Sequence, residues 1–380
     1  MLADRPGRKK VGGAILTAAM RGDPNTRQVA IAGFAALVLA GCAYEEPPIS
    51  WEGEIIRFGA DEPEAVCGDS LEWMDARAVA LAETFSAAGA EVYPQVDFYW
   101  VPESWWEQDA CSAETAHACT VDNVIHSLSV PQEHELVHAL RRKKLPRVFE
   151  EGLATLYGDL GFTPVPSPRE RLQVMLEDDW DSTHEDYARA GHFVGFLVER
   201  YGLDPLLEMG EYAGFDASWS KTQSAFAAAY GFSLQDALVE YEEYPECSPL
   251  NWMNVDIACM QEPVVIDPPH GSGEVVFSQQ IACGEPDVRG PLWGSMFTET
   301  TIELTNQFDS GMFVRLLGDE NSEAKIVLSG CGGCPDAAWV WLGDGVPERF
   351  LHLPAGRYVL RMFRPIDDPG ESGVSFSYFE

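Results

Sequence analysis

Basic residues are scarce in this sequence: 25 lysines and arginines stand against 61 aspartates and glutamates, a formal net charge of −36. Such a surface repels phosphate backbones and anionic lipid headgroups, so it disfavours nucleic acid as a partner. The chain also lacks an internal repeat, a glycine-rich phosphate-binding loop and a nucleophile elbow. We therefore expect neither a repeat architecture nor the phosphoryl-transfer and serine-hydrolase chemistry that those motifs support.

The N-terminal apolar segment is too short to span a membrane. Residues 29–40 follow Arg21 and Arg27, and a membrane-spanning helix needs about 20 apolar residues. A basic stretch followed by a short apolar run is typical of a signal peptide. We predict that residues 1–41 are a signal peptide of an exported protein.

The end of this segment suggests a lipid anchor. Residues 39–42 read Leu-Ala-Gly-Cys, which resembles the bacterial lipobox. The resemblance implies that Cys42 is lipidated and attaches the protein to a membrane of the cell envelope. Ala43 after it is similar to outer-membrane sorting signals if the host is Gram-negative. Translation starting at Met20 instead of Met1 would give a more conventional signal peptide, and the alternative is an anchor helix with Cys42 there by chance.

Cysteine is used as in an oxidising compartment. The chain has nine cysteines, and if Cys42 carries lipid, an even number remains, which indicates disulfides. We expect local pairs, Cys111 with Cys119 and Cys247 with Cys259. A structural disulfide role is also favoured for Cys331 and Cys334, because no second C-x-x-C motif completes a zinc site.

The chemistry is concentrated in residues 134–138, which read His-Glu-Leu-Val-His. On a helix, side chains four residues apart share a face, so both imidazoles can bind one zinc ion. Glu135 between them can serve as general base, and a catalytic zinc needs a third protein ligand. Pro146 suits the start of a second helix, and either Glu150 or Glu151 on that helix can supply the ligand.

The same residues resemble a known family. His134 to Ala139, followed by Leu-Pro-Arg-x-Phe-x-Glu-Gly-Leu-Ala-Thr-x-Tyr at residues 145–157, is similar to gluzincin (MA-like) metallopeptidases. The resemblance extends over roughly residues 120–245. It implies that Glu151 is the third zinc ligand and that Tyr187, on a following helix, donates a hydrogen bond to the substrate oxyanion.

The expected fold is an α+β gluzincin-like domain, with a small antiparallel or mixed sheet and a helical subdomain, followed by an all-β sandwich. Periodicity predicts a helix over residues 70–90 and strands over residues 91–101 and 120–129. Residues 353–360 resemble a hairpin of pre-peptidase C-terminal domains, which bind carbohydrate, envelope components or the enzyme itself. The predicted parts are these: signal peptide 1–41, acidic tether 42–61, peptidase domain 62–246, linker 247–273 and β-sandwich 274–380.

Two functions are compatible with these motifs. The first is zinc-dependent hydrolysis of peptide bonds in peptides or proteins, with His134, His138 and Glu151 as ligands, Glu135 as base and Tyr187 as oxyanion donor. The alternative is a catalytically inactive envelope protein that uses a peptidase-like domain and the sandwich for binding or adhesion. Detection of bound zinc without turnover would favour the alternative.

Overall fold

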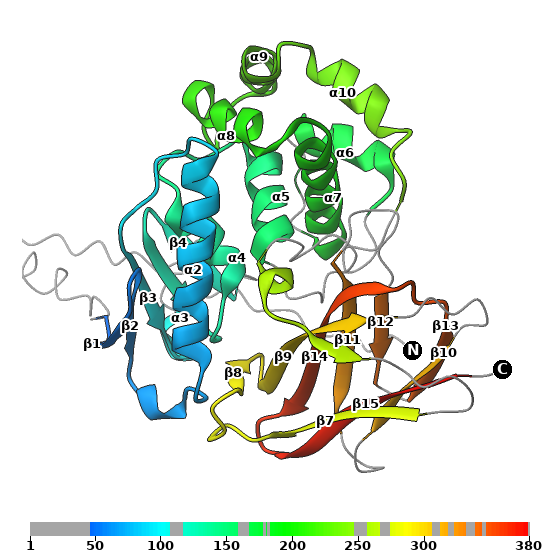
Figure 1. Ribbon diagram of the computed structural model, residues 1–380. Helices are drawn as coiled ribbons and strands as arrows, with labels where there is room; N and C mark the ends of the chain where they lie inside the picture. The colour runs from blue at the N-terminus through cyan, green and yellow to red at the C-terminus, as the bar shows by residue number, and fades with distance from the viewer. Residues whose placement is uncertain are drawn as a thin grey trace, which may run out of the picture. The chain divides into compact units, whose positions relative to one another are not determined.

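The computed structural model describes a mixed α/β chain with several sheets (Figure 1). Glu46–Glu380 form one compact unit. The residues described are 46–106, 117–158, 167–177, 180, 183–246, 257–266, 274–305, 312–317, 323–331, 339–343 and 347–378. The predicted signal peptide and Cys42 lie outside them. Among these residues, no helix is long and apolar enough to cross a membrane.

Five strands between residues 49 and 127 form a mixed sheet, with α2 and α3 in the connections on either side of β3. Its order is β1-β2-β3-β5-β4, with β2, β3 and β5 parallel and each edge strand antiparallel to its neighbour. The strands are β1 Ile49–Glu52, β2 Ile56–Ala60, β3 Val96–Trp100, β4 Ala118–Val121 and β5 Val124–Ser127. The prediction of a tether over residues 42–61 is therefore wrong from Ile49 onward. Its apolar residues, such as Phe58, are buried in the core, which outweighs the acidic character of the segment.

The single strand predicted over residues 120–129 is a hairpin. Asp122 has φ 53°, a left-handed conformation that aspartate tolerates better than most residues. The chain reverses there, so that Ala118 pairs with Ser127 and Val121 with Val124. As a result, β4 becomes the edge of the sheet and lies against the helix that follows.

Nine helices are described between residues 70 and 241. The predicted helix at residues 70–90 is confirmed as α2, which buries Trp73, Met74, Ala78, Leu81 and Phe85 on one face. The short helix α3 ends at Trp106, and Trp105 is buried against His126. The helices are α2 Ser70–Ala87, α3 Glu103–Trp106, α4 Glu133–Leu140, α5 Arg147–Gly158, α6 Arg169–Leu176, α7 His184–Tyr201, α8 Leu203–Tyr212, α9 Trp219–Tyr230 and α10 Leu234–Tyr241.

The C-terminal region is β-rich, as predicted for residues 274–380. One sheet has the order β13-β10-β15-β7, and the other has the order β12-β11-β14-β9-β6 with β8 paired to β9. The linker prediction for residues 247–273 fails at β6, because Val264–Ile266 pairs in parallel with β9. The strands are β6 Val264–Ile266, β7 Glu274–Ile281, β8 Arg289–Leu292, β9 Ser295–Leu304, β10 Met312–Leu317, β11 Lys325–Gly330, β12 Trp339–Leu342, β13 Glu348–Leu351, β14 Gly356–Pro365 and β15 Gly370–Tyr378.

The described disulfides join distant parts of the sequence. Cys67 is bonded to Cys283 and Cys259 to Cys331, at separations of 216 and 72 residues. The predicted Cys247–Cys259 pair is therefore wrong, because close approach in the fold decides pairing. Cys119 is also disulfide-bonded, and its predicted partner, Cys111, lies outside the described residues. Bonded cysteines are typical of proteins outside the cytoplasm.

Candidate metal centre

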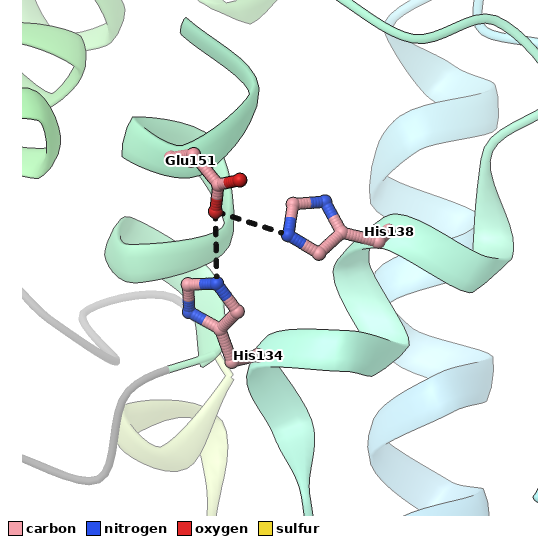
Figure 2. A group of neighbouring side chains, drawn as sticks. All are labelled: His134, His138 and Glu151. Carbon is pink, nitrogen blue, oxygen red and sulfur yellow. Dashed lines mark hydrogen bonds and ion pairs between the residues drawn. The ribbon is translucent and has the colours of Figure 1, made fainter. Parts of the chain in front are cut away.

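Helices α4 and α5 bring the predicted ligands together (Figure 2). On α4, His134 and His138 lie one turn apart with their ring centroids 5.0 Å apart. Glu151 extends from α5, and its Oε2 lies 3.3 Å from His134 Nε2 and 3.4 Å from His138 Nε2. The donor atoms of all three side chains fall within 4.8 Å of one another. This group could hold a metal ion.

Two glycines allow α5 to approach its neighbours closely. A Cβ at Gly152 would lie 2.5 Å from the backbone oxygen of Ala190 on α7, and a Cβ at Gly158 would lie 2.5 Å from Cα of His134. Both distances are shorter than Cβ contacts allow. The Gly after Glu151 therefore permits α5 to pack on α7, and Gly158 permits it to reach the start of α4.

Glu150 and Glu151, the alternatives that the residue pattern leaves open, have separate positions. Glu151 faces both histidines, whereas Glu150 lies behind His138, with its Oε1 2.9 Å from His138 Nδ1. The other oxygen of Glu150 accepts hydrogen bonds from Arg141 Nη2 at 2.5 Å and from the Leu145 amide at 2.8 Å. A carboxylate behind a histidine fixes the tautomer and the orientation of the ring.

The acidic and basic groups of this site shift one another's pKa values. Burial raises the pKa of Glu150, but Arg141 and His138 outweigh it and hold that pKa well below its ordinary value. Burial likewise opposes ionisation of Glu151, yet His138 and His134 lower its pKa to about 2. For His138, burial favours the neutral ring, but Glu151 and Glu150 together raise its pKa to about 9. The two glutamates are therefore carboxylates at neutral pH.

Glu135 is held by a residue of the edge strand. Thr120 on β4 lies with its Oγ1 2.6 Å from Glu135 Oε2 and 3.3 Å from the Glu135 backbone oxygen. The hydroxyl can donate to the carboxylate, which fixes one of its two oxygens and leaves the other for a second contact. Sequence reasoning missed Thr120, because only the β4–β5 hairpin brings this strand against α4.

Tyr187 lies beside His134, in the first turn of helix α7. Helix α7 begins at His184, and Thr183 caps it by accepting a hydrogen bond from the Asp186 amide. The Tyr187 ring stands edge-on to His134 at a centroid distance of 5.7 Å and edge-on to Trp180 at 5.0 Å. On the same helix, His184 is exposed at the first turn.

Thr155 does not support a candidate metal ligand, although its position suggests that role. One turn after Glu151, its hydroxyl is a candidate for bracing a ligand, but its Oγ1 is buried and makes no hydrogen bond to any described residue. Glu150 and Arg141 occupy that supporting position instead. The sequence signal for them was the adjacent Glu-Glu pair combined with the basic loop at residues 141–144.

Comparison with known proteins adds little. A scan against protein-family models and a search of curated proteins both find no match. Among solved structures, the pre-peptidase C-terminal domain of a Bacillus anthracis collagenase matches 31% of this chain and 94% of its own, with 13% identity and a TM-score of 0.21.

Two periplasmic inhibitors of g-type lysozyme are also similar in part. PliG of Aeromonas hydrophila matches over 30% of this chain and 92% of its own, with 19% identity and a TM-score of 0.18. PliG of Salmonella Typhimurium matches over 31% of this chain and 97% of its own, with 17% identity and a TM-score of 0.20. Such low TM-scores do not establish a shared fold.

Proposed function

We propose that this protein is a zinc-dependent peptidase of the gluzincin type that acts in the cell envelope. The observation that carries the proposal is the convergence of His134, His138 and Glu151 from two helices. Glu135, the residue type that serves as general base in this motif, lies on the same helix. A chance His-Glu-x-x-His sequence on a surface helix would have no reason to face a half-buried carboxylate on a second helix.

The donor set fits zinc. Imidazole nitrogens and carboxylate oxygens bind zinc at about 2.0–2.2 Å, so a tetrahedral site needs donor atoms about 3.3 Å apart. The two nitrogen–oxygen separations of 3.3 and 3.4 Å are close to this value. Three protein ligands leave the fourth position open, as catalytic zinc sites do.

Glu135 would perform the proton transfers. When bound, zinc supplies Lewis-acid chemistry, which lowers the pKa of water towards about 7 and polarises a carbonyl group. Glu135 would accept the proton of the attacking water and deliver it to the leaving amine. The contact with Thr120 supports this role, because it orients the carboxylate before the substrate arrives.

Tyr187 would stabilise the oxyanion of the tetrahedral intermediate through its hydroxyl. Its ring is held between Trp180 and His134, next to the ligand group. A phenol can donate this hydrogen bond without taking part in metal binding, so its role is separable from that of the histidines.

The location we propose is the envelope, with Cys42 lipidated and the outer membrane as the membrane if the host is Gram-negative. The disulfides support an extracytoplasmic protein. Substrates would be peptides or proteins of that compartment, and the β-rich region would bind envelope components. Replacement of Cys42 by Ser should abolish labelling with a fatty-acid probe, and persistent labelling would contradict the anchor.

The direct test of function uses purified residues 43–380 and a quenched peptide library. We expect one zinc per chain by elemental analysis, and cleavage that a chelator stops and added zinc restores. His138→Ala should lose both zinc and cleavage, whereas His352→Ala, an exposed histidine of the β-rich region, should lose neither. Zinc binding without any turnover would favour the non-catalytic envelope function instead.

A further inference from the structure

A buried cluster of charged groups lies where the β-rich region meets α2. Glu299 on β9 accepts a hydrogen bond from Arg361 Nε at 2.7 Å and from the Trp73 indole nitrogen at 3.3 Å. The guanidinium groups of Arg77 and Arg289 lie 4.9 and 5.0 Å from the Trp73 ring. Burial raises the pKa of Glu299, but these arginines outweigh it and hold the pKa below its ordinary value.

Helix α2 is attached firmly to this region at its N-terminus. Cys67, which precedes α2, is disulfide-bonded to Cys283. Ser70 Oγ donates to the Gly290 backbone oxygen at 3.0 Å and accepts from the Gly290 amide at 2.8 Å. Arg289 also donates to Asp69, at 2.9 Å. The start of α2 is thus fixed to strand β8 by several hydrogen bonds.

The same helix reaches the metal centre through a buried ion pair. Arg77 Nε lies 2.6 Å from Glu133 Oε1, and the two side chains are 3% and 0% exposed. Glu133 is the first residue of α4 and the neighbour of His134 in the chain. A carboxylate at this end of a helix interacts favourably with the helix dipole.

Two further observations show that the start of α4 depends on neighbouring elements. Gln132, at the N-cap position, makes no side-chain capping bond. The segment before α4 is bonded to the β-rich region, because the Val130 amide donates a hydrogen bond to the Pro291 backbone oxygen at 2.9 Å. The position of His134 is therefore set by contacts from α2 and β8 as well as by α4 itself.

We infer that the Arg77–Glu133 pair positions His134, and that Glu299 and Arg361 make the β-rich region part of the structure that holds the metal centre. Neither Arg77 nor Glu133 would touch the ion or the substrate, so both are positioning residues. This inference rests on the proposed function, because zinc affinity is the main property that the position of His134 would change.

The test uses full-chain variants: Arg77→Met, Glu133→Gln, the double variant, and Glu299→Gln. Each single change leaves a buried charge without its partner, which destabilises the fold, whereas removal of both charges restores much of that loss. We expect zinc to bind about 10–100-fold more weakly in both single variants. The double variant should regain stability but not affinity, and its metal-free α4 should exchange amide hydrogens faster than wild type.

Glu299→Gln tests the link to the β-rich region. We expect zinc affinity to fall by about 2- to 30-fold, the range of coupling between distant sites. Arg364→Met is the matched control, because Arg364 is also buried but bonds Asp368 and the Glu371 backbone within the β14–β15 turn. This variant should lose stability and keep zinc affinity.

Three results would overturn the inference. Recovery of affinity together with stability in the double variant would mean that the pair is structural only. If Arg364→Met weakened zinc binding as much as Glu299→Gln does, zinc affinity would simply follow global stability. If zinc affinity were unchanged in Glu299→Gln, the β-rich region would have no part in holding the metal centre. A wild-type chain that binds no zinc would instead overturn the proposed function, and α4 exchange in the metal-free protein would still decide whether the pair holds this helix.

Discussion

The two histidines of α4 lie against different walls. Behind His138 is a polar wall, in which Glu150 contacts the ring and Arg141 contacts Glu150. Beside His134 is an aromatic wall, in which Tyr187 contacts the ring and Trp180 contacts Tyr187. The polar wall can fix the tautomer of His138 through a charged carboxylate. The aromatic wall instead places a ring that carries a hydroxyl next to His134.

This difference suggests a division of labour. A carboxylate behind a ligand raises its basicity and fixes its orientation, so the polar wall should set metal affinity. A phenol beside the ligands should act on the substrate, so the aromatic wall should set turnover. Variants of the polar wall should therefore change zinc affinity, whereas variants of the aromatic wall should change kcat.

The largest effect should come from Glu135, which belongs to neither wall. Glu135→Gln keeps the shape of the side chain and removes the base, and such proton-transfer groups contribute typically 10²–10⁴-fold. We expect kcat to fall by about that factor with zinc content intact, measured by peptide cleavage and elemental analysis. Loss of zinc from this variant would make Glu135 structural and would contradict its assignment as base.

Tyr187→Phe should remove the hydroxyl of the aromatic wall and leave the packing of its ring unchanged. Loss of one oxyanion donor costs on the order of 10²–10³ in kcat, and KM and zinc affinity should change little. His184→Ala is the control, since His184 is exposed on the same helix. Near-normal kcat in Tyr187→Phe with a collapse in His184→Ala would transfer the role to His184.

Glu150→Gln should break the polar wall. We expect zinc affinity to weaken by about 10–100-fold, the usual cost of losing a group behind a metal ligand. Chelator competition would measure the change, with Glu170→Gln, an exposed residue of α6, as the matched control. If Glu150→Gln abolished zinc binding while Glu151→Gln preserved it, the two glutamates would have the opposite roles.

The smallest effect should be on acid stability of the metal-free protein. The pKa of Glu150 is lower in the folded chain than its ordinary value of 4.5. Its stabilising contribution is therefore complete above about pH 4.5 and is lost as the pH falls further. Denaturation between pH 5 and pH 2 should show a shallower loss for Glu150→Gln than for wild type, by at most about 1.4 kcal/mol per pH unit. Parallel curves would mean that folding does not lower the pKa of Glu150.

Local patterns predicted the helices and strands better than they predicted contacts. The His134–His138 spacing places both rings on one face of α4, and periodicity over residues 70–90 predicted the helix α2, Ser70–Ala87. Adjacent residues such as Glu150 and Glu151 point in directions about 100° apart on a helix. Which of them faces α4 depends on how the two helices pack, and that information is not in the spacing.

Long-range partners were the main failure. Cys67 pairs with Cys283 across 216 residues, and composition gives no sign of such a pair. Residues 49–60 looked like a tether because Glu and Pro precede them, yet β1 and β2 complete the first sheet. Thr120 and Trp180 also escaped prediction, because their contacts with Glu135 and Tyr187 arise only in the folded chain.

The central claim is that His134, His138 and Glu151 together bind zinc. Its most direct test is a crystal of the zinc-loaded chain, measured for anomalous scattering at the zinc absorption edge. Our account predicts one peak within about 2.0–2.2 Å of both Nε2 atoms and a Glu151 carboxylate oxygen. A peak on Glu150 instead of Glu151, or no peak between the two helices, would contradict it.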